Sequence, residues 1–166
     1  MKKIVILAGG YSKEREVSLQ TAKSVYSELK RKKKYKLKII DPDGNLIKKL
    51  RKYKPSVVLN LLHGRYGEDG YIQTVLENEK INYTHSGVIS SSIAIDKVIS
   101  KKIFNKKRIL TPKYFVYSFK NNFTKKQIIN KIKKKFLFPV VIKPINEGSS
   151  VNVFICNSNN IFKNIN

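Results

Sequence analysis

Two side chains in the N-terminal half of the chain are of types that bind small charged ligands. Glu14 lies on a loop after Gly9-Gly10, where backbone without a Cβ can approach a ligand, and its carboxylate could pair with an ammonium group. His63 is followed by glycines at positions 64, 67 and 70, and its imidazole could donate to a carboxylate. Each also has a structural explanation, because Glu14 favours a helix N-terminus through the helix dipole and His63 could cap a loop.

A later stretch could contact phosphate groups. Residues 147–150 are Glu-Gly-Ser-Ser, and a loop of such small residues could fold over phosphates with its backbone N–H groups and hydroxyls. An ordinary turn explains the same residues equally well. Lys143 ends an apolar run beside Pro144, where a solvated lysine is less expected, which gives that residue some independent support.

The elements that must position Glu14 and His63 alternate between strands and helices. Apolar, β-branched runs predict strands at residues 3–8, 35–40, 56–62 and 81–83, and helical spacing predicts helices at 16–30, 46–53 and 70–79. This alternation indicates right-handed βαβ crossovers and a Rossmann-like parallel sheet, the α/β class. Ligands bind beyond the carboxyl ends of such strands, so the loops that carry Glu14 and His63 should open on one edge.

The pattern changes after Gly87. Helices are predicted at 90–105 and at 124–135, the second with Thr124 as its N-cap, and strands at 113–117, 138–144 and 151–156. We therefore predict two domains, an N-terminal α/β domain at residues 1–92 and an α+β domain at residues 93–166. The second domain has few elements with which to close a core, so we expect it to be truncated.

The composition excludes several classes of protein. The 166 residues are 41% hydrophobic, enough for a core, and the single Cys156 excludes a disulfide framework and a multi-cysteine zinc site. The start of the chain does not have the pattern of a signal peptide, and no apolar run approaches the ~18 residues that span a bilayer. We expect a cytoplasmic protein without a membrane partner.

The formal net charge of +24 has two explanations. Clustered lysines at 30–36 and 131–135 would suit a basic nucleic-acid-binding module, because lysine releases counterions from phosphates. However, Lys, Asn, Ile, Tyr and Phe are all in excess together, and these residues share A- and T-rich codons. We favour this compositional explanation, so a nucleic-acid partner is the less expected alternative.

Four segments resemble the D-alanine–D-alanine ligase family of ATP-grasp enzymes in order and spacing. They are residues 9–19 (GGYSKEREVSL), 63–70 (HGRYGEDG), 83–87 (YTHSG) with Asp96-Lys97, and 139–144 (PVVIKP) with 147–151 (EGSSV). Each segment is weak alone, but the four occur in the family's order and extend from residue 9 to residue 151. The resemblance implies the N-terminal half of such a ligase, with a Rossmann-like domain followed by an incomplete ATP-grasp central domain.

The resemblance assigns substrate roles to three residues. Glu14 would hold the ammonium group of the first D-alanine, and His63 would lie near its carboxylate. Ser149 would lie by the second D-alanine and hydrogen-bond towards Glu14, so Glu14 and Ser149 are the candidate catalytic residues. Two positions depart from family glycines, because His85 and Asn152 stand there instead.

The resemblance also implies a phosphate site. The residues expected to contact the phosphates of ATP are Lys97, Lys143, Gly148, Ser149 and Ser150. Glu68 and Asp69 look like metal ligands, but the family does not use this pair in that way. We interpret them as loop and helix-start residues, and no metal ligand is predicted in this chain.

The implied activity is ATP-dependent ligation of two D-alanines for peptidoglycan synthesis. ATP phosphorylates the first D-alanine, and the amine of the second attacks the acyl phosphate, with Mg²⁺ and cationic groups stabilising the charge. The Mg²⁺ ligands and the transition-state arginine would belong to a C-terminal part that cannot be placed in this sequence. The expected partners are therefore D-alanine, ATP, and either a second copy of the chain or a separate C-terminal half. A ligase that joins D-alanine to D-lactate or D-serine is the nearest alternative.

Overall fold

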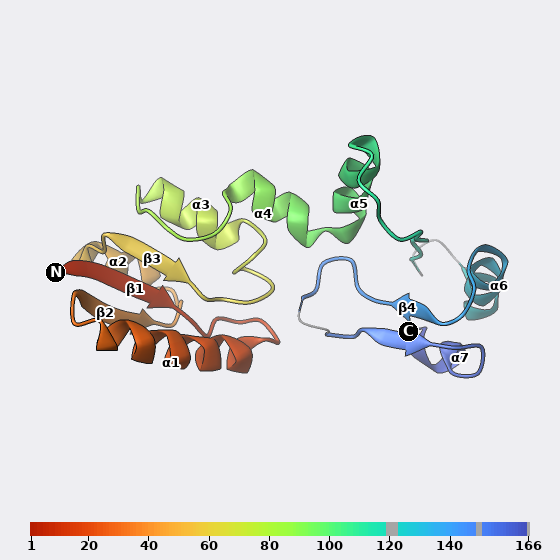
Figure 1. Ribbon diagram of the computed structural model, residues 1–166, viewed down its shortest axis with the longest axis horizontal. Coiled ribbons are helices and arrows are strands. Elements are labelled where there is room, and N and C mark those ends of the chain that lie inside the picture. Colours follow the sequence, from red (N-terminus) through yellow and green to blue (C-terminus); the bar gives the residue numbers. More distant parts are fainter. Residues whose placement is uncertain (119–122, 149–150, 166) are drawn as a thin grey trace. The chain divides into compact units, whose positions relative to one another are not determined.

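The computed structural model describes residues 1–118, 123–148 and 151–165 (Figure 1). The chain folds as two compact units. The first unit is Met1–Asp96 with Asn146–Ser149, and the second is Lys97–Ile145 with Ser150–Asn166. The predicted domain boundary after residue 92 lies inside helix α4 (Val88–Ile95), and the assignment of two domains stays a prediction.

The first unit is built on a parallel sheet. Strands β1 (Lys2–Leu7), β2 (Tyr35–Ile40) and β3 (Val57–Asn60) lie in the order β2-β1-β3. Leu7 pairs with both Ile40 and Asn60, so the three strands end at the same edge. The predicted strand at 81–83 is reduced to one parallel bridge, in which Val58 hydrogen-bonds to Asn82 and Thr84. The loops after β1 and β3 therefore begin at the same edge of the sheet, as predicted.

Both faces of the central strand are covered, which explains its uninterrupted apolar sequence. Ile6 packs with Ala22 of helix α1 (Arg15–Arg31). Val5 and Leu7 point the other way and pack against helices α2 (Leu46–Tyr53) and α3 (Tyr71–Asn78), through residues such as Leu50. The alternation of side chains along β1 thus places α1 on one face of the sheet and α2 with α3 on the other (Figure 1).

The second unit holds the remaining elements. Strands β4 (Val140–Ile142) and β5 (Phe154–Cys156) pair in antiparallel fashion. Its helices are α5 (Lys97–Lys106), α6 (Lys125–Lys135) and α7 (Ile161–Asn164). The buried cluster of this unit joins both strands to α6 and α7, and its members include Ile128, Cys156 and Ile161.

Two predictions for this region were wrong in detail. The single helix expected at 90–105 is interrupted at Asp96, whose extended backbone separates α4 from α5. The strand expected at 113–117 is absent from the described residues, because its backbone joins no hydrogen-bonded ladder there. Phe115 and Tyr117 nevertheless pack against the cluster around Ile128. The apolar pattern of this segment therefore results from contact with the core and not from pairing with another strand.

Candidate active site

Hydrogen bonds connect the loop after β1 to the loop after β3. Gly9 and Gly10 have φ of +92° and +75°, in the left-handed region where a Cβ is strained. The Gly9 N–H donates to Ser18 Oγ at 2.9 Å, and the Ser18 hydroxyl donates to the Leu61 carbonyl at 2.6 Å. One buried serine therefore links the two loops that carry Glu14 and His63.

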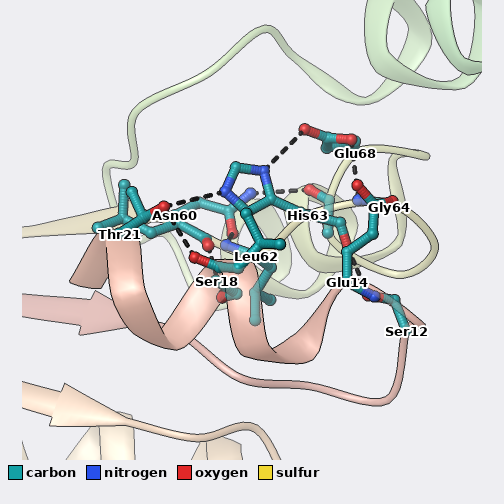
Figure 2. Close-up of polar contacts among 12 residues, drawn as sticks. Ser12, Glu14, Ser18, Thr21, Asn60, Leu62, His63, Gly64 and Glu68 are labelled. Atoms are coloured by element: carbon teal, nitrogen blue, oxygen red, sulfur yellow. Dashed lines mark hydrogen bonds and ion pairs between the residues drawn. The ribbon is translucent and has the colours of Figure 1, made fainter. Parts of the chain in front are cut away.

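A second serine links Glu14 and His63 more directly. The Ser12 hydroxyl accepts from the Glu14 N–H at 3.1 Å and donates to the His63 carbonyl at 2.7 Å (Figure 2). Glu14 and His63 are thus brought together at the carboxyl edge of the sheet. The two loops thus share one edge, as the sequence predicted, and the substrate roles of Glu14 and His63 stay predictions.

The Glu14 side chain is a buried carboxylate whose hydrogen bonding is incomplete. Only 3% of the residue is exposed, and its Oε1 receives no hydrogen bond from any described residue. Buried polar oxygens are rarely left without a donor, since the desolvation cost is then uncompensated. Oε1 is therefore suited to accept hydrogen bonds from a ligand.

The backbone of two glycines lies close against this carboxylate. Gly64 has φ of +68°, and a Cβ there would overlap Glu14 Oε2. A Cβ at Gly148 would lie 3.0 Å from Oε2 and 3.4 Å from Oε1, which is also crowded. Gly148 was expected at the ATP phosphates, and the structure places its α-carbon beside Glu14, so its phosphate role stays a prediction.

His63 lies between two oxygen atoms. Its Nδ1 is 3.6 Å from Glu68 Oε1, and its Nε2 is 3.4 Å from Thr21 Oγ1 (Figure 2). Glu68 Oε2 accepts the Gly64 N–H at 2.9 Å. The interpretation of Glu68 as only a loop residue was therefore incomplete, because its carboxylate contacts the site.

Asp69, in contrast, has the loop and helix-start role predicted for it. Its two carboxylate oxygens accept the N–H groups of Tyr66 and Tyr71, and Tyr71 is the first residue of α3. Within the described ranges, no three His, Cys, Asp or Glu side chains gather in a way that could hold a metal ion.

Arg15 and Asp41 form an ion pair that also hydrogen-bonds to Gly10 and that was not predicted from the sequence. Asp41 follows β2 and accepts the Gly10 N–H at 2.9 Å, while Arg15 donates to the Gly10 carbonyl at 2.9 Å and pairs with Asp41. The hydrogen bond from Arg15 lowers the pKa of the Asp41 carboxyl, and the Gly10 N–H lowers it further against the effect of burial. The rule that ligand-binding loops follow parallel strands would have singled out Asp41, since it ends β2 at the same edge.

The predicted phosphate-binding lysines lie in the second unit. Lys97 donates through both its backbone N–H and its Nζ to the Ile145 carbonyl, each at 3.2 Å, and Lys143 is exposed. Lys101, which was not predicted, donates to Thr111 and Pro112. Burial lowers the pKa of Lys101, and the charge of Lys143 lowers it further, so these two lysines lie within electrostatic reach. Ser149 and Ser150 lie outside the described residues.

Solved structures similar to this chain define its class. A D-alanine–D-alanine ligase from Bacillus anthracis matches 98% of this chain and 52% of its own length, with 32% identity and a TM-score of 0.79. The same type of enzyme from Helicobacter pylori has a TM-score of 0.77 at 22% identity, which shows the fold alone. The chain has the fold of the ATP-grasp ligases, as its sequence predicted.

Sequence comparison identifies the family within that class. A sequence model of the family described as D-ala D-ala ligase C-terminus matches residues 103–165. The D-alanine–D-alanine ligase of Pelagibacter ubique is 60% identical over 164 residues, and that of Wolbachia pipientis wMel is 47% identical over 152. The chain belongs to the D-alanine–D-alanine ligase family. These matches cover 99% and 92% of the chain but 53% and 46% of the relatives, so it spans about half of their length.

Proposed function

We propose that this chain supplies the first-substrate pocket and part of the phosphate site of an ATP-dependent D-alanine–D-alanine ligase. In this reaction a carboxylate oxygen of the first D-alanine takes the terminal phosphoryl group of ATP, which releases ADP. The amine of the second D-alanine then attacks the acyl carbon, and phosphate leaves as the peptide bond forms. The observation that carries the proposal is the buried Glu14 carboxylate, whose Oε1 accepts no hydrogen bond from the described residues and against which the backbone of Gly64 and Gly148 lies closely.

The substrate roles follow from charge and position. Glu14 would bind the ammonium group of the first D-alanine, since a charge-assisted hydrogen bond would compensate the burial of its carboxylate. His63 would bind the carboxylate of the same molecule. Ser149 would lie beside the second D-alanine, by resemblance to the family.

The phosphates of ATP would be held by cationic and small residues. A B. anthracis ligase solved in complex with ATP is 37% identical to this chain and has a TM-score of 0.61, with 69% of this chain covered. By the resemblance of their sequence segments to the family, Lys97 and Lys143 would contact phosphate oxygens, together with the loop at 148–150. The described residues do not offer a ligand cluster for Mg²⁺, so we assign no metal-dependent step to them. We propose that Mg²⁺ is bound in the part of the family's length that this chain does not match.

The partners and location complete the proposal. The proposed partners are D-alanine, ATP, and either a second copy of the chain or a C-terminal half like that of its relatives. None of the described helices is long and apolar enough to cross a membrane. We propose the cytoplasm as its location, because the reaction consumes ATP.

Binding of D-alanine tests this function without requiring turnover. The isotope-labelled chain should show D-alanine-dependent changes at the Gly64 and Gly148 amides, with smaller changes from L-alanine. Glu14→Gln should abolish the response, because a neutral amide cannot pair with the ammonium group. Glu16→Gln is the matched control, since Glu16 is an exposed residue two positions away. Unchanged D-alanine binding by Glu14→Gln would refute the proposed pocket.

A further inference from the structure

The imidazole of His63 lies between two oxygen atoms from different elements, one 3.4 Å from Nε2 and the other 3.6 Å from Nδ1. Thr21 belongs to α1, Glu68 to the loop before α3, and His63 to the loop after β3 (Figure 2). Which ring nitrogen carries hydrogen is decided by whether each oxygen can accept or must donate. The other contacts of Thr21 and Glu68 answer that question.

Thr21 presents a lone pair to the ring. A threonine hydroxyl has one proton, and Thr21 donates it to the Val17 carbonyl one turn earlier, at 2.9 Å. With the hydroxyl in that orientation, Oγ1 accepts from His63 Nε2, 3.4 Å away, whereas a hydroxyl turned towards the ring would donate to an unprotonated Nε2. This contact alone is weak, because the distance is long for a hydrogen bond.

Glu68 presents an acceptor to the other edge. An ionised carboxylate has no proton to donate, and Glu68 Oε2 already accepts the Gly64 N–H at 2.9 Å. The remaining oxygen, Oε1, lies 3.6 Å from Nδ1. A bare nitrogen lone pair facing this oxygen would be repelled, whereas an N–H at Nδ1 would be attracted.

We propose that Glu68 is a positioning residue that keeps a proton on Nδ1 of His63 and fixes the plane of the ring. Its second oxygen accepts the N–H of Gly64, whose left-handed backbone lies against the Glu14 carboxylate where a Cβ would overlap Oε2. One carboxylate thus couples the residue proposed for the substrate carboxylate to the pocket proposed for the ammonium group. The carboxylate and the ammonium group of one small substrate must be bound at the same time. Contacts from a single residue, Glu68, to both binding positions would therefore improve their alignment. The substrate part of this inference rests on the proposed function, whereas the proton position does not.

The chain has only two histidines, so nitrogen spectra of the imidazole rings can test the proton position directly. His85→Gln removes the other histidine signal and assigns that of His63. At alkaline pH, where ordinary histidines are neutral, Nδ1 of His63 should carry hydrogen in the unsubstituted chain. A signal showing an unprotonated Nδ1 would overturn the proposal even before any variant of Glu68 is made.

Glu68→Gln should reverse the tautomer. The Gly64 N–H still needs an acceptor, so the glutamine carbonyl would take that contact and its NH₂ group would face Nδ1. Nδ1 must then accept, and the ring proton moves to Nε2, opposite Thr21 Oγ1. An Nδ1 that keeps its hydrogen in a folded Glu68→Gln chain would contradict the proposal.

Two controls separate positioning from general effects. Glu16→Gln removes the same unit of charge at an exposed site and should leave the tautomer unchanged. Thr21→Val removes the acceptor at Nε2 but should leave hydrogen on Nδ1, because Glu68 is intact. A tautomer change in Glu16→Gln would mean that net charge, rather than Glu68, sets the proton position.

D-alanine binding by Glu68→Gln should weaken by about tenfold, the order of effect of a hydrogen bond to a charged group. Unchanged affinity would refute the coupling to the substrate pocket. If the unsubstituted chain shows the predicted tautomer but does not respond to D-alanine, the proposed function fails and the positioning role of Glu68 stands.

Discussion

At the scale of single residues, the site depends on where side chains are missing as much as on where they are present. Gly64 and Gly148 come from different loops, and both approach the Glu14 carboxylate so closely that a Cβ would crowd it. Glu14 is buried with an oxygen that accepts no hydrogen bond from the part of the chain that the structure describes, a state that costs stability until a ligand supplies a donor. The proposed pocket therefore combines a buried carboxylate with two glycines whose backbone lies against it.

Gly64→Ala should test this directly. The new Cβ would meet Glu14 Oε2 and would also be strained at φ of +68°, so we expect a loss of about 1–3 kcal/mol in unfolding free energy. Binding of D-alanine should be lost as well. Urea denaturation and ligand titration measure the two effects.

Gly44→Ala is the matched control for this substitution. A Cβ there would meet no atom within 4 Å, and its backbone is not in the left-handed region. The control should be neutral or slightly stabilising, because alanine reduces the freedom of the unfolded chain. Equal losses in both variants would contradict the role given to Gly64.

The Arg15–Asp41 pair makes a prediction about pH. The folded-state pKa of Asp41 is lowered by Arg15, so the unfolded chain binds the extra proton and the pair stabilises the fold at pH values above the ordinary aspartate pKa of 3.8. This stabilisation is lost as pH falls through the lowered folded-state pKa. Because 41% of the Asp41 side chain is exposed, the contribution should be below about 1 kcal/mol.

Asp41→Asn isolates this ion pair, since its amide oxygen can still accept the Gly10 N–H. The variant should be less stable than the unsubstituted chain at neutral pH, and the difference should vanish in acid. It should also shrink in ~1 M salt, which screens exposed charges. A difference that is independent of both pH and salt would mean that packing, and not charge, is responsible.

At the scale of elements, helix α6 shows how local chemistry defines an end. Thr124 Oγ1 accepts the Gln127 N–H and Gln127 Oε1 accepts the Thr124 N–H at 2.8 Å, which is a complete capping box. Thr124→Ala removes half of it and should lower the unfolding free energy by about 1 kcal/mol in thermal or urea unfolding. Asn130→Ala, an exposed position inside the same helix, should be neutral or slightly stabilising.

The same elements show what the sequence could and could not predict. Strand 35–40 and helix 46–53 were predicted to the residue, because each has a clear period and a turn beside it. The prediction of a strand at 113–117 was wrong because a strand requires a hydrogen-bonded partner strand. Apolar residues such as Phe115 and Tyr117 can pack against a core without forming such a strand. The loops at the sheet edge were predictable from topology, which placed Glu14 and His63 together.

The supporting contacts of the site were not predictable in this way. Glu68 reaches back to His63 across a loop, and Asp41 reaches Gly10 from another strand. Such contacts depend on the path of the loop backbone, including left-handed residues such as Gly10 and Gly64, which residue types alone do not specify.

At the scale of the whole molecule, the net charge is +24, and several of the lysines that contribute to it contact aromatic rings within their own unit. Lys3 and Lys38 both lie over the ring of Tyr53, and Lys131 lies 3.7 Å from the centroid of the Phe123 ring. Lysine and aromatic residues, which are in excess together, thus contact each other in the fold. These contacts fit the compositional explanation of the charge and do not require a nucleic-acid partner.

The last prediction concerns the activity of the 166 residues by themselves. Assayed with ATP, Mg²⁺ and D-alanine, the chain should form no D-alanyl-D-alanine above background. It spans 53% of its Pelagibacter relative, and the resemblance puts the Mg²⁺ ligands and the transition-state arginine in the other part. An arginine in such a role contributes about 10³-fold or more to phosphoryl transfer, so its loss alone would hide turnover.

Addition of the remaining half of a close relative, expressed separately, provides the positive control for this assay. Turnover that appears only in the mixture would show that the pocket of this chain is competent and that the missing groups can be supplied in trans. The glutamine variant at Glu14 should abolish that restored turnover, whereas Glu16→Gln should not. ATP-dependent dipeptide formation by this chain alone would contradict the prediction, and would require that a second copy of the chain supplies the phosphoryl-transfer groups.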